Sequence, residues 1–138
     1  MLPLLIGIST GILTILLVGL LRIVNKRIMY GLILSGIGFL YVGYTWMDLN
    51  QLIINIIQAI VFVLFAYYGI IKSIYILVAG YFLHGLWDLG YTYFTASQSL
   101  PPHYDIFCLT VDFIIGAYIL IFRKQFILSP RNESIRVT

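Results

Sequence analysis

The sequence predicts an all-α integral membrane bundle of five transmembrane helices. Hydrophobic residues make up 62% of the chain, and the mean hydropathy is +1.04. Charged residues make up only 9%, whereas soluble domains usually contain about 25%. The few charges interrupt long apolar runs and are not spread along the chain. Since these runs take up most of the 138 residues, no room remains for a second, soluble domain.

The apolar runs are long enough to cross a bilayer, which takes roughly 20 helical residues. They predict spans at about residues 2–24, 28–46, 52–71, 74–94 and 105–122, within one transmembrane domain over residues 1–124. Residues 125–138 are predicted to form a mobile cytoplasmic tail. The sequon Asn132-Glu133-Ser134 lies in that tail, so we expect it to stay unmodified.

The first run has no basic n-region and no small-residue cleavage site. We therefore expect a retained span rather than a signal peptide. Gly7 and Gly11 form a G-x-x-x-G pair within it. Such a pair lets another helix approach closely, so packing inside the bundle is its expected role.

The distribution of basic residues predicts the orientation. With five spans, all eight basic residues fall on one side of the membrane: Arg22, Lys26, Arg27, Lys72, Arg123, Lys124, Arg131 and Arg136. The positive-inside rule then predicts an outside N-terminus and a cytoplasmic C-terminus, in a plasma or inner membrane. Because the net charge of +3 comes from residues at span ends, it does not indicate a nucleic-acid partner.

A histidine and two aspartates lie inside the predicted spans. His84 and Asp88 are one helical turn apart on the fourth span, and Asp112 lies on the fifth. A charged side chain near the bilayer centre costs roughly 3 kcal/mol, so such residues normally face a bundle interior or a watery cavity. We predict that these three residues form the catalytic part of a pocket in the outer half of the membrane.

Other side chains are predicted to line this pocket and bind its ligand. Tyr104 and Cys108 continue the helical stripe that ends at Asp112, and further polar or aromatic residues point from the neighbouring spans. The predicted ligand-binding residues are Trp87, Tyr81, Tyr104, Cys108, Asn55, Gln58 and Tyr41.

The chemistry that fits this set is acid–base catalysis, because carboxyl groups that meet in a low-dielectric site tend to share protons. The predicted function is an isomerase, cyclase or hydrolase acting on a lipophilic small molecule, such as a lipid or isoprenoid. No phosphate loop, Ser–His–Asp spacing or flavin or nicotinamide fingerprint is present. No cofactor and no metal are predicted, because two histidines are too few for a three-histidine zinc site, although mixed ligation by His, Asp and Cys stays open.

The residues leave other functions open. The polar side chains also fit a purely structural role, in which they satisfy one another between helices. A non-catalytic membrane subunit that binds a lipid, pigment or partner protein is the alternative function, and a small transporter is the third. The assembly also stays open between a homo-oligomer and a larger membrane complex.

The spacing of these residues resembles a known pattern. His84-x-x-Trp87-Asp88, followed by Pro102-x-Tyr104, Cys108 and Asp112, is similar to a family of small polytopic membrane proteins that is classed as a domain of unknown function. In that family a further histidine often follows the W-D pair, whereas Tyr91 or Thr92 stands there in this chain. The resemblance implies that residues 84–88 and 108–112 belong together, and it implies no activity.

Overall fold

The computed structural model describes residues 1–95 and 100–127, which form helices joined by short connections and contain no strand. The helices are α1 (Leu2–Leu20), α2 (Lys26–Tyr44), α3 (Leu49–Ile71), α4 (Ile74–Phe94), α5 (Tyr104–Ile121) and α6 (Arg123–Ile127). The predicted all-α class is therefore confirmed for these residues. The sequon at residues 132–134 and the tail from residue 128 onward lie outside the described part of the chain.

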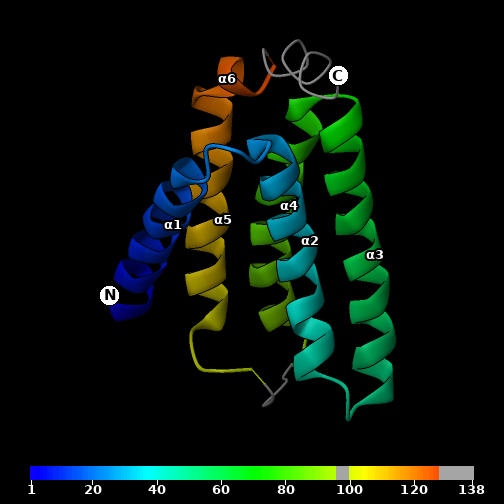
Figure 1. Cartoon of the computed structure of the whole chain (residues 1–138). Coiled ribbons are helices and arrows are strands. Elements are labelled where there is room, and N and C mark those ends of the chain that lie inside the picture. Colours follow the sequence, from blue (N-terminus) through cyan, green and yellow to red (C-terminus); the bar gives the residue numbers. More distant parts are fainter. Residues whose placement is uncertain (96–99, 128–138) are drawn as a thin grey trace.

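The long helices α1 to α5 run alternately up and down between the same two ends of the bundle (Figure 1). Helix α4 packs against α5 on one side and α3 on the other, and α2 packs against α3. Helix α1 packs on α5 and scarcely contacts α2. Helix α4 is therefore the central element, flanked by the others.

Capping side chains explain why two helices begin earlier than the apolar runs predict. The Asn25 side chain accepts hydrogen bonds from the backbone N–H groups of Arg27 and Ile28, so α2 begins at Lys26 and not near residue 28. Asp48 caps α3 in the same way, and that helix begins at Leu49 and not near residue 52. Helix α1 is shorter than predicted, since it ends at Leu20.

Four described helices, α1, α2, α3 and α5, are long and apolar enough to cross a membrane. This indicates a membrane protein, as predicted. Helix α4 has 21 residues, which is sufficient length, but it is not in this group. Its tyrosines, His84 and Asp88 lower its mean hydropathy, so the candidate site itself accounts for the difference.

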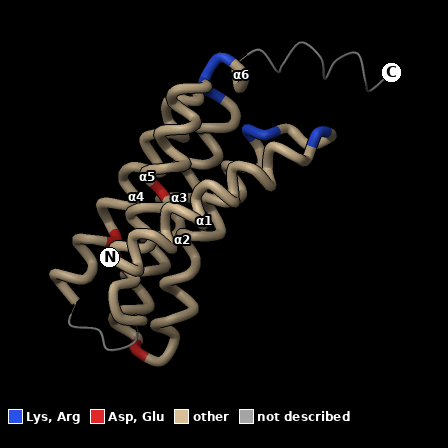
Figure 2. Tube along the Cα trace, turned by 90° about the vertical axis from the view of Figure 1, so that its left-hand side faces the viewer, with Lys and Arg blue, Asp and Glu red and all other residues tan. Residues whose placement is uncertain are grey.

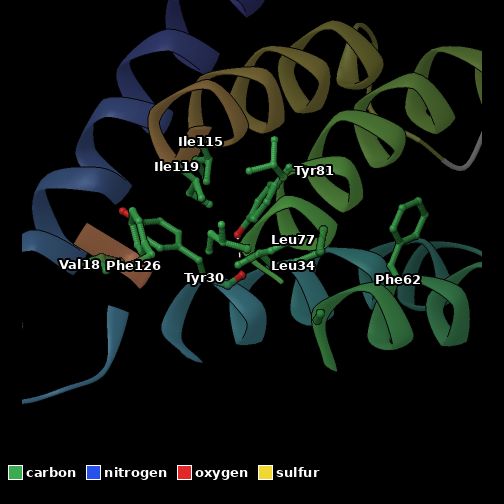
Figure 3. Packing of buried hydrophobic residues seen from close by; sticks show 12 residues of the cluster. Val18, Tyr30, Leu34, Phe62, Leu77, Tyr81, Ile115, Ile119 and Phe126 are labelled. Atoms are coloured by element: carbon green, nitrogen blue, oxygen red, sulfur yellow. Dashed lines mark hydrogen bonds between the residues drawn. The ribbon is translucent and has the colours of Figure 1, made fainter. Parts of the chain in front are cut away.

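The hydrophobic core lies toward the end of the bundle that carries α6 (Figure 3). Tyr30, Leu34, Leu77, Ile115 and Ile119 are each at most 1% exposed. Phe126 of α6 packs edge-on against the Tyr30 ring at 5.8 Å between centroids. Helix α6, which spans Arg123–Ile127, is therefore held against the core by an aromatic residue.

The G-x-x-x-G pair makes the close contact between α1 and α5. A Cβ atom at Gly7 would lie 2.9 Å from the Phe107 carbonyl oxygen and 2.9 Å from Thr110 Cβ. A Cβ atom at Gly11 would meet Ile114 at 3.0 Å. Both glycines are buried, so the absence of a side chain is what lets the two helices approach.

Replacing Gly7 with valine is expected to destabilise the protein by about 1–3 kcal/mol, because the new side chain overlaps backbone and Cβ atoms of α5. The thermal midpoint of the detergent-solubilised protein measures this effect. Gly19→Val, on the same helix, is the control, since nothing lies within 4 Å of a Cβ there. Equal losses from both variants would contradict this packing.

Candidate functional site

Three buried titratable side chains meet where α4 packs against α5. The Nδ1 atom of His84 lies 2.8 Å from Oδ2 of Asp112 and 3.3 Å from Oδ2 of Asp88. The exposed fractions are 1% for His84, 0% for Asp88 and 2% for Asp112. The 3.6-residue period of α4 brings His84 and Asp88 to one face, and α5 supplies Asp112 from the next helix. We call these three residues the His/Asp triad.

Phe62 of α3 fixes the plane of the imidazole. Its ring meets the His84 ring edge-on, with 4.6 Å between centroids and 71° between planes. Because Phe62 is only 4% exposed, the aromatic ring also keeps water from that side of the imidazole.

The pairing of α3 with α4 brings a further polar residue to the level of the triad. Asn55 contacts Tyr91, Phe62 contacts His84, and Gly69 contacts Leu77, which defines one antiparallel register. In that register Gln58 lies level with Asp88. Gln58 is only 3% exposed, so its amide is buried at the level of Asp88.

Several buried polar atoms around Asp88 have no hydrogen-bond partner in the protein. They are both carboxyl oxygens of Asp88, both amide atoms of Gln58, Asn55 Oδ1, Trp87 Nε1, Tyr41 Oη and His84 Nε2. The Tyr41 hydroxyl interacts with the Asp88 carboxyl group, but not in hydrogen-bonding geometry. Buried polar groups normally have partners. Of these atoms, Asp88 Oδ2 still lies at ion-pair distance from His84 Nδ1, 3.3 Å away.

A second part of the polar region is joined by side-chain hydrogen bonds. The Asn55 side-chain amide donates to Thr45 Oγ1 at 2.9 Å and to the Tyr91 hydroxyl at 3.0 Å. The Tyr91 hydroxyl in turn donates to Gln51 Oε1 at 3.0 Å. These bonds tie α2, α3 and α4 together, so the purely structural role does apply to Asn55.

A cavity of about 200 Å³ lies on the other side of the triad, among α1, α2 and α5. His84 and Asp112 form part of its wall, and Asp88 does not. The remaining wall is mostly apolar, with a few hydroxyl and thiol groups: Thr10, Thr14, Ile33, Ile37, Leu40, Tyr104, Phe107, Cys108, Val111 and Ile115. Because α1 and α2 scarcely contact each other, the cavity lies beneath a loosely packed seam.

A larger groove of about 350 Å³ lies between Val61, Phe65, Lys72 and Ile76 on α3 and α4. It contains no member of the triad and is lined almost wholly by apolar side chains. The smaller cavity is therefore the better candidate site, since it brings buried titratable groups to an open space.

The predicted site residues fall into distinct groups in the structure. Tyr104 and Cys108 line the cavity with His84 and Asp112. Tyr41, Asn55, Gln58 and Trp87 surround Asp88 or the network behind it. Tyr81 lies apart from both groups, because its hydroxyl donates to the Tyr30 carbonyl oxygen at 2.7 Å within the hydrophobic core (Figure 3).

Replacing Tyr81 with phenylalanine is expected to lower stability by about 1 kcal/mol, the net value of one hydrogen bond. Ligand binding in the cavity should stay unchanged, because Tyr81 is not part of its wall. Thermal unfolding of the purified variant measures the first effect. If Tyr81→Phe kept wild-type stability but no longer bound the ligand, Tyr81 would instead belong to the binding site.

The triad is also the group of described residues that has the spacing to hold a metal ion. One ligand atom from each of His84, Asp88 and Asp112 lies within 4.8 Å of the others. In the structure His84 Nδ1 is already paired with Asp112 at hydrogen-bond distance. A shared proton accounts for that contact without a metal.

Sequence reasoning missed several apolar contributors to the site. Phe62, which packs on His84, and Ile33 and Ile37, which line the cavity, are ordinary hydrophobic residues of a membrane span. Thr14 was also missed, although it lies one turn after Thr10 on the same helix face. That i, i+4 hydroxyl pair is the signal that predicts Thr14.

The fold and site define a class: a small all-α membrane protein with a buried histidine–carboxylate cluster beside an apolar cavity. The chain belongs to the family of unknown function DUF6010, whose model matches residues 2–125. The predicted membership of a family of unknown function is thereby confirmed. Searches of curated proteins and of solved structures find no match.

Proposed function

We propose that this chain is an intramembrane acid–base enzyme that moves a proton on a lipophilic substrate. The observation that carries the proposal is the pair of buried groups, His84 and Asp112, at the wall of an apolar cavity. An apolar cavity of about 200 Å³ suits a hydrocarbon portion of a substrate, and the two polar groups orient its reacting end.

The topology proposed with this function has five spans, an outside N-terminus and a cytoplasmic C-terminus. Helix α4 runs alongside α3 and α5 over the same thickness (Figure 1), so a membrane that contains those helices also contains α4. The described lysines and arginines gather at the end that carries α6 (Figure 2). The positive-inside rule makes that end cytoplasmic.

Electrostatics favours a triad that holds exchangeable protons. With a neutral imidazole and both carboxyl groups ionised, the triad carries two negative charges, and such a charge is costly in a low-dielectric interior. A proton held between His84 Nδ1 and Asp112 Oδ2, which lie 2.8 Å apart, reduces that charge. A cluster that keeps protons for this reason is able to donate one and accept another.

The reaction class that fits is isomerisation or cyclisation by one proton in and one proton out. The Asp112–His84 pair donates a proton to one carbon of a substrate double bond, and it accepts a proton from another carbon as the new double bond forms. The substrate keeps its formula and the enzyme regains its proton, so no co-reactant is needed. Hydrolysis fits less well, because the mostly apolar cavity wall does not favour a stored water molecule.

Asp88 acts in this scheme as a positioning residue. Its Oδ2 atom lies 3.3 Å from His84 Nδ1, the nitrogen that Asp112 also contacts, but Asp88 does not line the cavity, so its role is to help orient the imidazole. Interhelical packing alone explains the triad less well. A structural network would leave few buried polar atoms unpaired, whereas both side-chain amide atoms of Gln58 have no hydrogen-bond partner in the protein.

Isotope labelling tests the proposal even while the substrate is unidentified. Lipid extracts are compared between membranes that contain the protein and membranes that lack it, after incubation in ordinary or heavy water. In ordinary water, we expect one lipophilic compound to be converted to a product with a different retention time and the same mass. In heavy water, the same product should contain deuterium. A compound that co-purifies with the protein but is never converted would instead make the chain a non-catalytic binding subunit.

A further inference from the structure

A second cavity lies at the end of the bundle that carries α6, far from the triad in the fold. It has a volume of about 230 Å³ and is bounded by the α1–α2 connection and by α6. Its wall includes three basic residues, Arg22, Lys26 and Arg27, beside Gln125 and Phe126. The polar character of this wall distinguishes it from the apolar cavity beside the triad.

Arg27 is held in place with part of its guanidinium group unused. Its Nε atom donates to the Gly69 carbonyl oxygen at the end of α3, at 2.8 Å. Its Nη2 atom is buried and has no hydrogen-bond partner in the protein. An oriented guanidinium with a free donor is suited to an anion that accepts hydrogen bonds, and phosphate geometry matches it well.

The charges around this cavity are not balanced within the described part of the chain. Arg22, Lys26, Arg27, Lys72, Arg123 and Lys124 all lie at this end (Figure 2). The described acidic residues lie elsewhere, because Asp48 caps the start of α3 and Asp105 lies in the first turn of α5, both at the opposite end, and Asp88 and Asp112 are buried inside the bundle. The local field therefore attracts an anion, and the N-terminal end of α2 adds to it.

We propose that this cavity binds a phosphate group, supplied by the headgroup of an anionic phospholipid in the adjoining leaflet. Arg27 Nη2 donates to a phosphate oxygen, and Lys26 and Arg22 contribute positive charge. Apolar side chains at the same end are open to the bilayer, including Ile23 at 92% and Leu20 at 75% exposure. The acyl chains of the lipid lie along them.

Native mass spectrometry of the full detergent-purified chain tests the proposal with three probes: phosphatidylglycerol, phosphatidylcholine and inorganic phosphate. The wild type is expected to retain phosphatidylglycerol over phosphatidylcholine. Arg27→Gln should weaken that retention by about tenfold, and the double variant Arg22→Gln/Lys26→Gln by about fivefold or more. The double variant leaves the Arg27–Gly69 bond intact, so a folding defect of Arg27→Gln cannot hide the result.

Lys72→Gln is the matched control. It removes one positive charge from the same end, but Lys72 lies over the Tyr68 ring and does not line the cavity. It should leave retention within about twofold of the wild type. Equal weakening by Lys72→Gln and Arg27→Gln, or no preference between the two lipids, would overturn the proposal. If equimolar inorganic phosphate displaced the lipid, the cavity would still be a phosphate site. Its ligand would then be a soluble phosphate, and the assignment to a lipid headgroup would be overturned.

Discussion

Turnover is expected to fall by about 10²–10⁴-fold when Asp112 is replaced with asparagine, the usual range for removal of a general acid or base. The amide has the shape of the carboxyl group but does not act as a general acid or base at neutral pH. It still reaches His84, whose Nδ1 lies 2.8 Å from Asp112 Oδ2, so the fold should survive. Initial rates in membranes, normalised to the amount of folded protein, give the measurement.

Asp105→Asn is the matched control for this experiment. It is the same substitution on the same helix, but Asp105 lies in the first turn of α5 and does not line the cavity. We expect it to keep wild-type turnover within about twofold. If Asp112→Asn were fully active, acid–base catalysis by the triad would be refuted.

Filling the cavity beside the His/Asp triad is expected to remove activity, although the three residues of the triad are unchanged. Ile37 lines the cavity from α2, and a tryptophan there projects bulk into the space that a substrate needs. We expect turnover to fall by about 10²-fold, as for a displaced substrate, while the thermal midpoint falls little because the cavity accepts the larger ring. Rates and thermal unfolding are measured on the same preparation.

Leu32→Trp serves as the control for added bulk. Leu32 is on the same helix and is 60% exposed on the outer surface of the bundle. Its replacement should change neither rate nor stability appreciably. A fully active Ile37→Trp enzyme would show that the substrate does not use this cavity.

Much of the architecture could be predicted from composition, because hydrophobic length and charge position are properties of the chain alone. The contact between His84 and Asp88 also follows directly from their i, i+4 spacing. The fourth predicted span, residues 74–94, has the same bounds as helix α4, although the polar site residues lower the mean hydropathy of that helix.

The division of labour within the site could not be predicted, because it depends on helix rotation. Sequence spacing treats Asp88 and Asp112 alike, yet only Asp112 faces the cavity. Tyr81 is three residues before His84, but its long side chain reaches the Tyr30 carbonyl oxygen in the core. Such differences arise from packing between helices, which one sequence does not encode in any visible period.

The cavity itself was also invisible to sequence reasoning. It exists because α1 leans on α5 through Gly7 and Gly11 and scarcely contacts α2. Two glycines thus fix the helix that forms one wall of the cavity. The apolar residues that complete the wall look like any membrane-facing residues until the helices are assembled.

An experimental density map of the protein, purified with its native lipids, tests the central claim most directly. The proposed function requires elongated density in the cavity, with its polar end within hydrogen-bond distance of His84 or Asp112, and the loss of that density in Ile37→Trp. Continuous protein packing with no space beside His84 would contradict the proposal. So would a compact metal-ion peak coordinated by His84, Asp88 and Asp112.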